Sequence, residues 1–321
     1  MAVATLLCMA ACARLLRNVS AGAAVELAAG LALGASSHYR FIAVLAVGFL
    51  VLLLMPEGRR ALRDPRVWIA IAFGAAAWTP LVAWNVDNAE AGLRFQLVDR
   101  HPWAFHADGI QFVLVQSLLV TPLLLVAMVA AAWRYARDPR PAPRFFALLG
   151  GLVVLGFFAL GFFADTERVS FHWPLQGFIA LLPLLPSVLG RWPRWLRLAT
   201  GALAATGLAL MLAYHAAVSV PRLRETTAAT RWYPGNFAGW QKLATQAQRA
   251  LHGMPKGTRI VADDFKIGAE LGFALRNPRI AVLPHPLNVK HGRAPQLHLW
   301  KLREEAVDRS KGPVLLVVGA S

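Results

Sequence analysis

Eight apolar segments, separated by short charged loops, occupy the chain up to about residue 216. They span residues 2–16, 22–37, 41–55, 67–85, 110–133, 145–163, 172–189 and 198–216. A helix needs about 20 residues to cross the hydrocarbon core of a bilayer, and four or five of the segments reach that length. The pattern predicts an α-helical transmembrane bundle of about eight membrane segments over residues 1–216.

The remainder, residues 217–321, reads as an ordinary globular domain. The whole chain is 57% hydrophobic with a mean hydropathy of +0.49, and this excess is confined to the first domain. Helices are predicted at 238–252, 265–275 and 301–309, and strands at 258–262, 279–283 and 313–318. Alternating strands and helices predict a small, mostly parallel α/β domain.

Arginines are concentrated in alternate loops. The loops near 14–17, 56–66, 134–144 and 190–197 hold thirteen Arg and three acids, whereas the loops near 38–40, 86–109 and 164–171 hold four Arg and six acids. The positive-inside rule places the first set in the cytoplasm. We therefore expect a bacterial inner-membrane protein whose C-terminal domain is periplasmic. The same distribution explains the net charge of +16 and argues against a nucleic-acid partner, which needs a continuous basic face.

A polar break between two short apolar segments provides the first candidate site. Ser36 to Arg40 separate segments 22–37 and 41–55, and an arginine at such a break is costly unless it is paired. Arg40 can bind a phosphate through two parallel hydrogen bonds, with His38 and Tyr39 as further donors. An equally weighted alternative is an interfacial arginine that reaches water beside a tyrosine at the membrane surface.

Two outer segments carry the other candidate binding residues. The loop 86–109 suits an amphipathic segment on the outer membrane surface, and residues 165–174 place acids and a histidine beside a tryptophan that can stack on a sugar. The candidates are Arg94, Arg100, His101, Glu167, His172 and Trp173. An aromatic side chain at the membrane interface is the alternative; it is favoured for the first segment and equally weighted for the second.

Metal and cofactor motifs are missing from the sequence. His285, His291 and His298 lie in one stretch, but their spacing matches no zinc pattern and no cysteine accompanies them. The sequence has no glycine-rich nucleotide-binding motif. It therefore predicts neither a metal nor a cofactor.

Several short motifs in order resemble a known family. They are Gly30–Gly34 leading into Ser37–Arg40, Pro80 and Trp84-Asn85, Phe171–Phe178, Ala262–Phe265 and Gly292–Gln296. Together they resemble the bacterial branch of the polytopic glycosyltransferases related to dolichyl-phosphate-mannose protein mannosyltransferases, which includes the lipid A aminoarabinose and galacturonic acid transferases.

The resemblance implies a GT-C fold and a sugar transfer at the outer side of the membrane. The donor would be a polyprenyl-phosphate-linked sugar, and the acceptor an envelope lipid, glycan or protein. Arg40 and His38 would lie at the carrier phosphate, and His172 and Trp173 at the mouth of the donor cavity.

One departure from the family concerns its catalytic carboxylate. The family has it in an Asp-Glu pair in the first outer loop, which has no counterpart here, and the predicted topology places Met1 outside. We therefore expect an N-terminally truncated form of a longer enzyme, with the catalytic residues unknown. The alternative is a non-catalytic membrane scaffold or a transporter-like protein.

Overall fold

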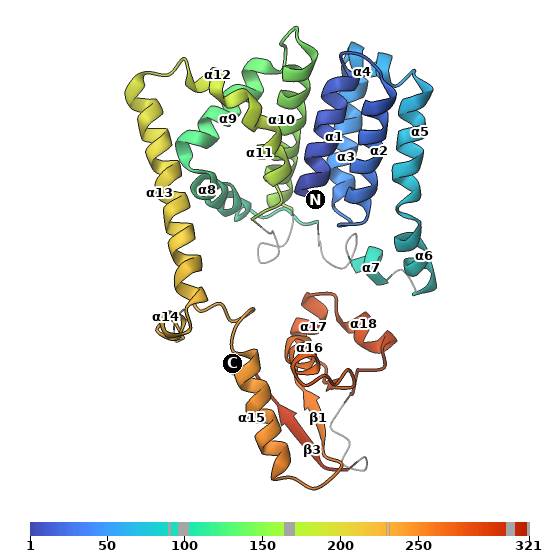
Figure 1. Ribbon diagram of the computed structural model, residues 1–321, viewed down its shortest axis with the longest axis vertical. Coiled ribbons are helices and arrows are strands. Elements are labelled where there is room, and N and C mark those ends of the chain that lie inside the picture. Colours follow the sequence, from blue (N-terminus) through green and yellow to red (C-terminus); the bar gives the residue numbers. More distant parts are fainter. Residues whose placement is uncertain are drawn as a thin grey trace. The chain divides into compact units, whose positions relative to one another are not determined.

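The protein forms two compact units, shown in Figure 1. The computed structural model describes residues 1–88, 91–95, 103–163, 171–228, 230, 232–305 and 312–319. The first unit comprises Met1–Asp87 and Gln96–Met211, and the second comprises Asn88–Phe95 and Leu212–Ser321. The division thus falls a few residues before the predicted boundary, and Asn88–Phe95, from a predicted outer loop, belongs to the second unit.

The first unit is built of helices. They are α1 (Ala2–Leu15), α2 (Ala21–Ala35), α3 (Phe41–Leu54), α4 (Pro56–Ala61), α5 (Pro65–Ala76), α6 (Thr79–Asp87), α8 (Gly109–Val120), α9 (Pro122–Tyr135), α10 (Pro141–Gly161), α11 (Leu175–Leu181), the 3₁₀ helix η2 (Leu182–Leu184), α12 (Leu185–Leu189) and α13 (Arg194–Ser219), which runs on into the second unit.

Short-range signals in the loops set where these helices begin. Helices α4, α5, α9 and α10 each begin with proline, whose fixed φ suits the first helical position. Asp64 caps α5 by accepting a hydrogen bond from the backbone N–H of Arg66 at 2.9 Å. The Arg66 side chain also donates to this carboxylate and holds the pKa of Asp64 below its ordinary value. Prolines and a capping aspartate in the loops therefore determine the residues at which these apolar helices begin.

Glycines allow the helices of the first unit to pack closely. A Cβ added at Gly30 of α2 would lie 2.8 Å from the Sγ of Cys8 on α1. Helices α10 and α11 cross at Gly150 and Gly177, where an added Cβ on either residue would lie within 2.9 Å of the carbonyl oxygen of the other. Small residues at helix crossings are typical of membrane bundles, where close backbone approach replaces the hydrophobic drive of water.

Each of the eight predicted apolar segments coincides with helical structure. Within the described residues, three stretches are long and apolar enough to cross a membrane: Pro65–Asp87, Pro141–Gly161 and Arg194–Ser219. Helices α8 and α9 form a fourth if a pair bent by 102° counts as one span. Four shorter apolar stretches accompany them: Ala2–Leu15, Ala21–Ala35, Phe41–Leu54 and Leu175–Leu189. The fold is that of a helical membrane protein, while eight spans remain a prediction.

The second unit contains a three-stranded parallel sheet with helices. Its elements are α7 (Ala91–Arg94), α14 (Pro221–Glu225), α15 (Trp240–His252), β1 (Arg259–Ala262), α16 (Phe265–Ala274), β2 (Ala281–Val282), α17 (Pro286–Lys290), α18 (Ala294–Leu299) and β3 (Val314–Val317). The strand order is β2-β1-β3, with Val261 opposite both Ala281 and Leu316. Apolar side chains of α15 and α16 pack with those of the sheet into one core.

Five elements of this unit lie inside their predicted ranges, and one prediction is wrong. The helix expected at 301–309 is not present in its described part. Instead, Arg303 forms a parallel bridge with Val282, and the N–H of Glu304 donates to the Val282 carbonyl at 3.0 Å. The hydrogen bonds with β2 outweigh the local helix propensity of this stretch. Residues 306–309 of the predicted helix lie outside the described structure.

Candidate functional site at the polar break of the helical bundle

The turn between α2 and α3 is built by its own polar side chains. Ser37 donates a hydrogen bond from its hydroxyl to the Leu33 carbonyl at 2.7 Å, and the backbone N–H of Arg40 donates to Nδ1 of His38 at 3.1 Å. The ring of Phe41 packs against Gly34 so closely that an added Cβ there would overlap it. The result is a tight reversal that leaves His38 exposed and Tyr39 and Arg40 half-buried.

Arg40 lies over an aromatic ring from a distant part of the chain. Its guanidinium carbon is 3.8 Å from the ring centroid of Trp173, a typical cation–π distance. Trp173 is only 3% exposed and also packs on Phe157 of α10, with 5.9 Å between ring centroids. Stacking against the indole uses the face of the guanidinium, whereas its N–H donors lie in its plane. The stacked indole therefore restricts the orientation of the guanidinium.

Tyr39 is held from the other side by a buried amide. Nδ2 of Asn85 on α6 donates to the Tyr39 hydroxyl at 3.2 Å and to the Leu81 carbonyl at 2.8 Å. Asn85 is 1% exposed, so its polar atoms are removed from water and depend on these bonds. The two residues beside each other in the turn are thus anchored to different helical segments.

A second buried amide positions the segment that carries Trp173. Nε2 of Gln116 on α8 donates to the Phe171 carbonyl at 2.7 Å, and Gln116 is also almost completely buried. Phe112 of the same helix packs with Trp173 in one apolar cluster. Helices α8 and α10 therefore hold the backbone just before α11, and the adjacent His172 is exposed.

The structure brings some of the predicted binding residues together and not others. Arg40 and Trp173 are in contact in the first unit, and Tyr39 is the neighbour of Arg40 in the turn. His38 and His172 directly precede Tyr39 and Trp173 in the sequence. Arg94 lies on α7, in the second unit. Three predicted residues lie outside the described structure: Arg100, His101 and Glu167.

Two buried amides were not assigned to the site from the sequence. Asn85 and Gln116 are almost completely buried in the mainly apolar helices α6 and α8, and a buried polar side chain in such a helix is a recognised sign of a functional or positioning role. As for metals, no group of three or more potential ligands occurs within the described residues.

This fold defines a polytopic helical membrane protein with an arginine fixed at a polar break. The chain is similar to lipid A galacturonosyltransferase RgtD of Rhizobium johnstonii (strain DSM 114642 / LMG 32736 / 3841), with 27% identity over 270 residues. The match covers 80% of this chain and 53% of that protein, so the chain spans about half the length of this curated relative. No family model matches the chain. No solved structure matches it either.

Proposed function

We propose that the chain is part of a membrane glycosyltransferase that moves a sugar from a polyprenyl-phosphate carrier to an envelope lipid, glycan or protein. The observation that carries this proposal is the guanidinium of Arg40, held 3.8 Å over Trp173 at the junction of two short apolar helices. A cation fixed at the end of a helical bundle suits a lipid-linked phosphate, whose chain stays in the membrane. The similarity to a lipid A galacturonosyltransferase supports the same class of reaction.

The proposed reaction is a direct displacement at the anomeric carbon of the donor sugar. The bond between this carbon and the phosphate oxygen breaks, and the polyprenyl phosphate leaves with the electron pair. The acceptor oxygen forms the new bond, and its proton passes to a general base. Arg40 stabilises the negative charge that develops on the departing phosphate, while Trp173 orients the guanidinium.

The remaining groups have supporting roles in this proposal. His38 and Tyr39 add hydrogen-bond donors for the carrier phosphate, and His172 contacts the sugar. The base is expected to be a carboxylate, as in the family that the sequence resembles. The reaction takes place at the periplasmic side of a bacterial inner membrane, where the second unit lies.

A transfer assay with membranes tests the proposal. The complete gene is expressed in a strain that lacks it, and the transfer of labelled sugar from polyprenyl phosphate to membrane acceptors is measured. Arg40→Ala should reduce the rate about 100-fold or more, because a transition-state charge loses its donor. Arg40→Lys should recover only part of it, since an ammonium lacks the planar fork of donors.

The matched control is Arg17→Ala, which removes an exposed arginine from a loop at the predicted cytoplasmic side. Its rate should equal that of the wild type. Wild-type activity in the Arg40→Ala variant would remove Arg40 from the site. A complete absence of transfer by the wild-type protein, with its expression intact, would favour a scaffold or a transporter-like protein.

A further inference from the structure

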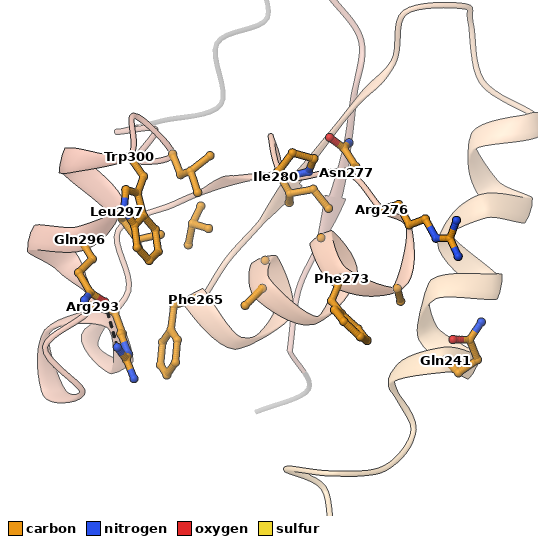
Figure 2. A pocket seen from close by; sticks show the side chains of 17 residues that line it. Gln241, Phe265, Phe273, Arg276, Asn277, Ile280, Arg293, Gln296, Leu297 and Trp300 are labelled. Carbon is orange, nitrogen blue, oxygen red and sulfur yellow. Dashed lines mark hydrogen bonds between the residues drawn. The ribbon is translucent and has the colours of Figure 1, made fainter. Parts of the chain in front are cut away.

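A large pocket in the second unit has the composition of a ligand site. Its volume is about 1020 Å³, at the upper end of typical small-molecule pockets. Small residues of α16 line it, together with the side chains from α15, α16, α18 and the loop after α16 that Figure 2 shows. All lining residues belong to the second unit, so the pocket is complete within it.

Aromatic rings line this pocket without being buried. Phe273 is 86% exposed and Trp300 61% exposed, and Phe265 lies half-buried on the same helix as Phe273. Phe265 and Phe273 are eight residues apart, which places them about 12 Å from each other along α16. Aromatic faces attract the C–H groups on the apolar side of a sugar ring, because the ring face is electron-rich. Two such rings along one helix suit a ligand of about two sugar units.

The charges in the pocket are of one sign. Among the 17 lining residues, all of them described, Arg276 and Arg293 are charged and none is acidic. Arg293 donates to Oε1 of Gln296 at 2.9 Å and lies 5.9 Å from the ring of Phe265. Figure 2 shows Arg276 at the opposite side of the pocket. Two guanidinium groups without an acidic lining residue favour a phosphorylated or carboxylated ligand.

The backbone of Arg276 adds a second, independent observation. The N–H of Asn277 donates to the Gly272 carbonyl at 2.9 Å, and that of Arg276 to the Phe273 carbonyl at 3.3 Å, which is the Schellman pattern at a helix C-terminus. Arg276 occupies its left-handed position with φ of 52°, where glycine is preferred. The helix dipole favours a cation near this helix end, but it does not require the arginine itself to adopt the left-handed backbone conformation. A residue that strains its backbone and faces a pocket is a candidate for function.

We propose that this pocket binds the anionic sugar headgroup of an envelope glycolipid, with the rings of Phe273 and Phe265 against the sugar and Arg276 and Arg293 at its phosphate or carboxylate. That this glycolipid is the acceptor rests on the proposed function. The binding itself does not, because the pocket needs no part of the first unit.

Isothermal titration of the full chain in detergent measures this binding. The probes are a phosphorylated glucosamine disaccharide, the same disaccharide without phosphate, and inorganic phosphate. The phosphorylated disaccharide should bind at least about tenfold more tightly than either of the others, since it uses both kinds of contact. Arg276→Gly should weaken it at least about tenfold and yet raise the melting temperature, because glycine relieves the left-handed strain. Phe273→Ala should also weaken binding at least about tenfold.

Two variants outside the pocket lining serve as controls. Lys301 has φ of 56° in the equivalent position after α18, so Lys301→Gly relieves similar strain without removing a lining residue. Phe237 is 89% exposed in the same unit, so Phe237→Ala matches Phe273→Ala. Both should bind the phosphorylated disaccharide as the wild type does.

Four results would overturn the proposal. They are no binding of the phosphorylated disaccharide, equal affinity for inorganic phosphate, equal affinity for the neutral disaccharide, and wild-type binding by the Arg276→Gly and Phe273→Ala variants. A fifth result would assign the pocket to a membrane-facing surface instead. It is the quenching, by brominated lipids in nanodiscs, of a tryptophan fluorescence signal that is present in the wild type and absent from Trp300→Phe. Binding without any sugar transfer would retain the pocket and reject the proposed function, and transfer without binding would do the reverse.

Discussion

Nδ2 of Asn85 donates a hydrogen bond to the hydroxyl of Tyr39 at 3.2 Å, joining two positions 46 residues apart in the chain. The bond connects α6 to the turn in which Arg40 lies. Because Asn85 is 1% exposed, loss of the Tyr39 hydroxyl removes one hydrogen bond from a buried amide that also donates to the Leu81 carbonyl.

Tyr39→Phe should therefore destabilise the first unit by about 1–2 kcal/mol, and Asn85→Ala by a similar amount. The free energy of unfolding of the detergent-solubilised chain checks both. The double variant should lose less than the sum of the single ones, because each removes the same bond. Strict additivity would show that the two side chains do not interact.

Gly177 supplies a second prediction, about the crossing of α10 and α11. A Cβ added there would lie 2.9 Å from the Gly150 carbonyl and 3.0 Å from the backbone nitrogen of Val154, and backbone atoms cannot yield without moving a helix. Gly177→Ala should thus lower stability by about 1–3 kcal/mol, as for other overpacked sites. Since Gly177 lies one turn after Trp173, the variant should also weaken binding of a lipid-linked donor.

Gly156 on α10 is the matched control, because nothing lies within 4 Å of the Cβ that would be added there. Gly156→Ala should leave stability unchanged or raise it by up to about 1 kcal/mol, since alanine is the better helix former. Thermal unfolding in the same detergent compares the stability of the two variants with that of the wild type. Similar losses in the two would mean that the close crossing is not a packing constraint.

Local signals explain why much of the helical part was predictable from the sequence. Apolar length, prolines and charged loops act over a few residues, so every predicted segment coincides with helical structure. The segment 110–133 was read as one element, whereas the chain bends by 102° between α8 and α9. Thr121 has φ of 72° there, and Pro122 follows it. Pro122 was the available signal, because a proline removes one hydrogen bond of a continuous helix.

The candidate site was predictable only in its position along the chain. A polar break with an arginine is visible in the sequence, but the face that a membrane helix turns toward a neighbour depends on packing over long distances. The sequence therefore did not predict the contact of Arg40 with Trp173 or the bonds of Asn85 and Gln116. Similarly, the stretch around Arg303 was predicted to be helical because the partner strand is not local.

The ion pair between Arg259 and Glu304 leads to a prediction for the second unit. The guanidinium of Arg259 on β1 donates two hydrogen bonds to the carboxylate, at 2.5 and 2.8 Å, and Glu304 is nearly buried. Removal of one partner leaves the other charge poorly solvated. Glu304→Ala should therefore lower the stability of this unit by about 1–3 kcal/mol, because it removes two charge-assisted hydrogen bonds from a guanidinium that is 25% exposed.

Replacing both partners tests the cause of that loss. Arg259→Met with Glu304→Leu should be clearly more stable than Glu304→Ala alone, because neither of the two charged groups remains. Hydrogen exchange of the β1 amides in the full chain measures the stability of this unit. Equal losses in the single and double variants would assign the effect to packing rather than to charge.

A close contact between Gly292 and Phe95 joins residues 91–95 to the rest of the second unit. It has φ of 66°, and an added Cβ would lie 2.6 Å from Cγ of Phe95. Gly292→Ala should thus add a steric clash to the backbone strain, for a total of about 2–4 kcal/mol. Gly257 has φ of 88° with nothing within 4 Å of its added Cβ, so Gly257→Ala should show the strain alone, about 1 kcal/mol. The amides of residues 91–95 should lose protection from hydrogen exchange in Gly292→Ala but not in Gly257→Ala. Adding Phe95→Ala to Gly292→Ala should recover part of the lost stability. Unchanged exchange there would contradict the contact that places Arg94 with the second unit.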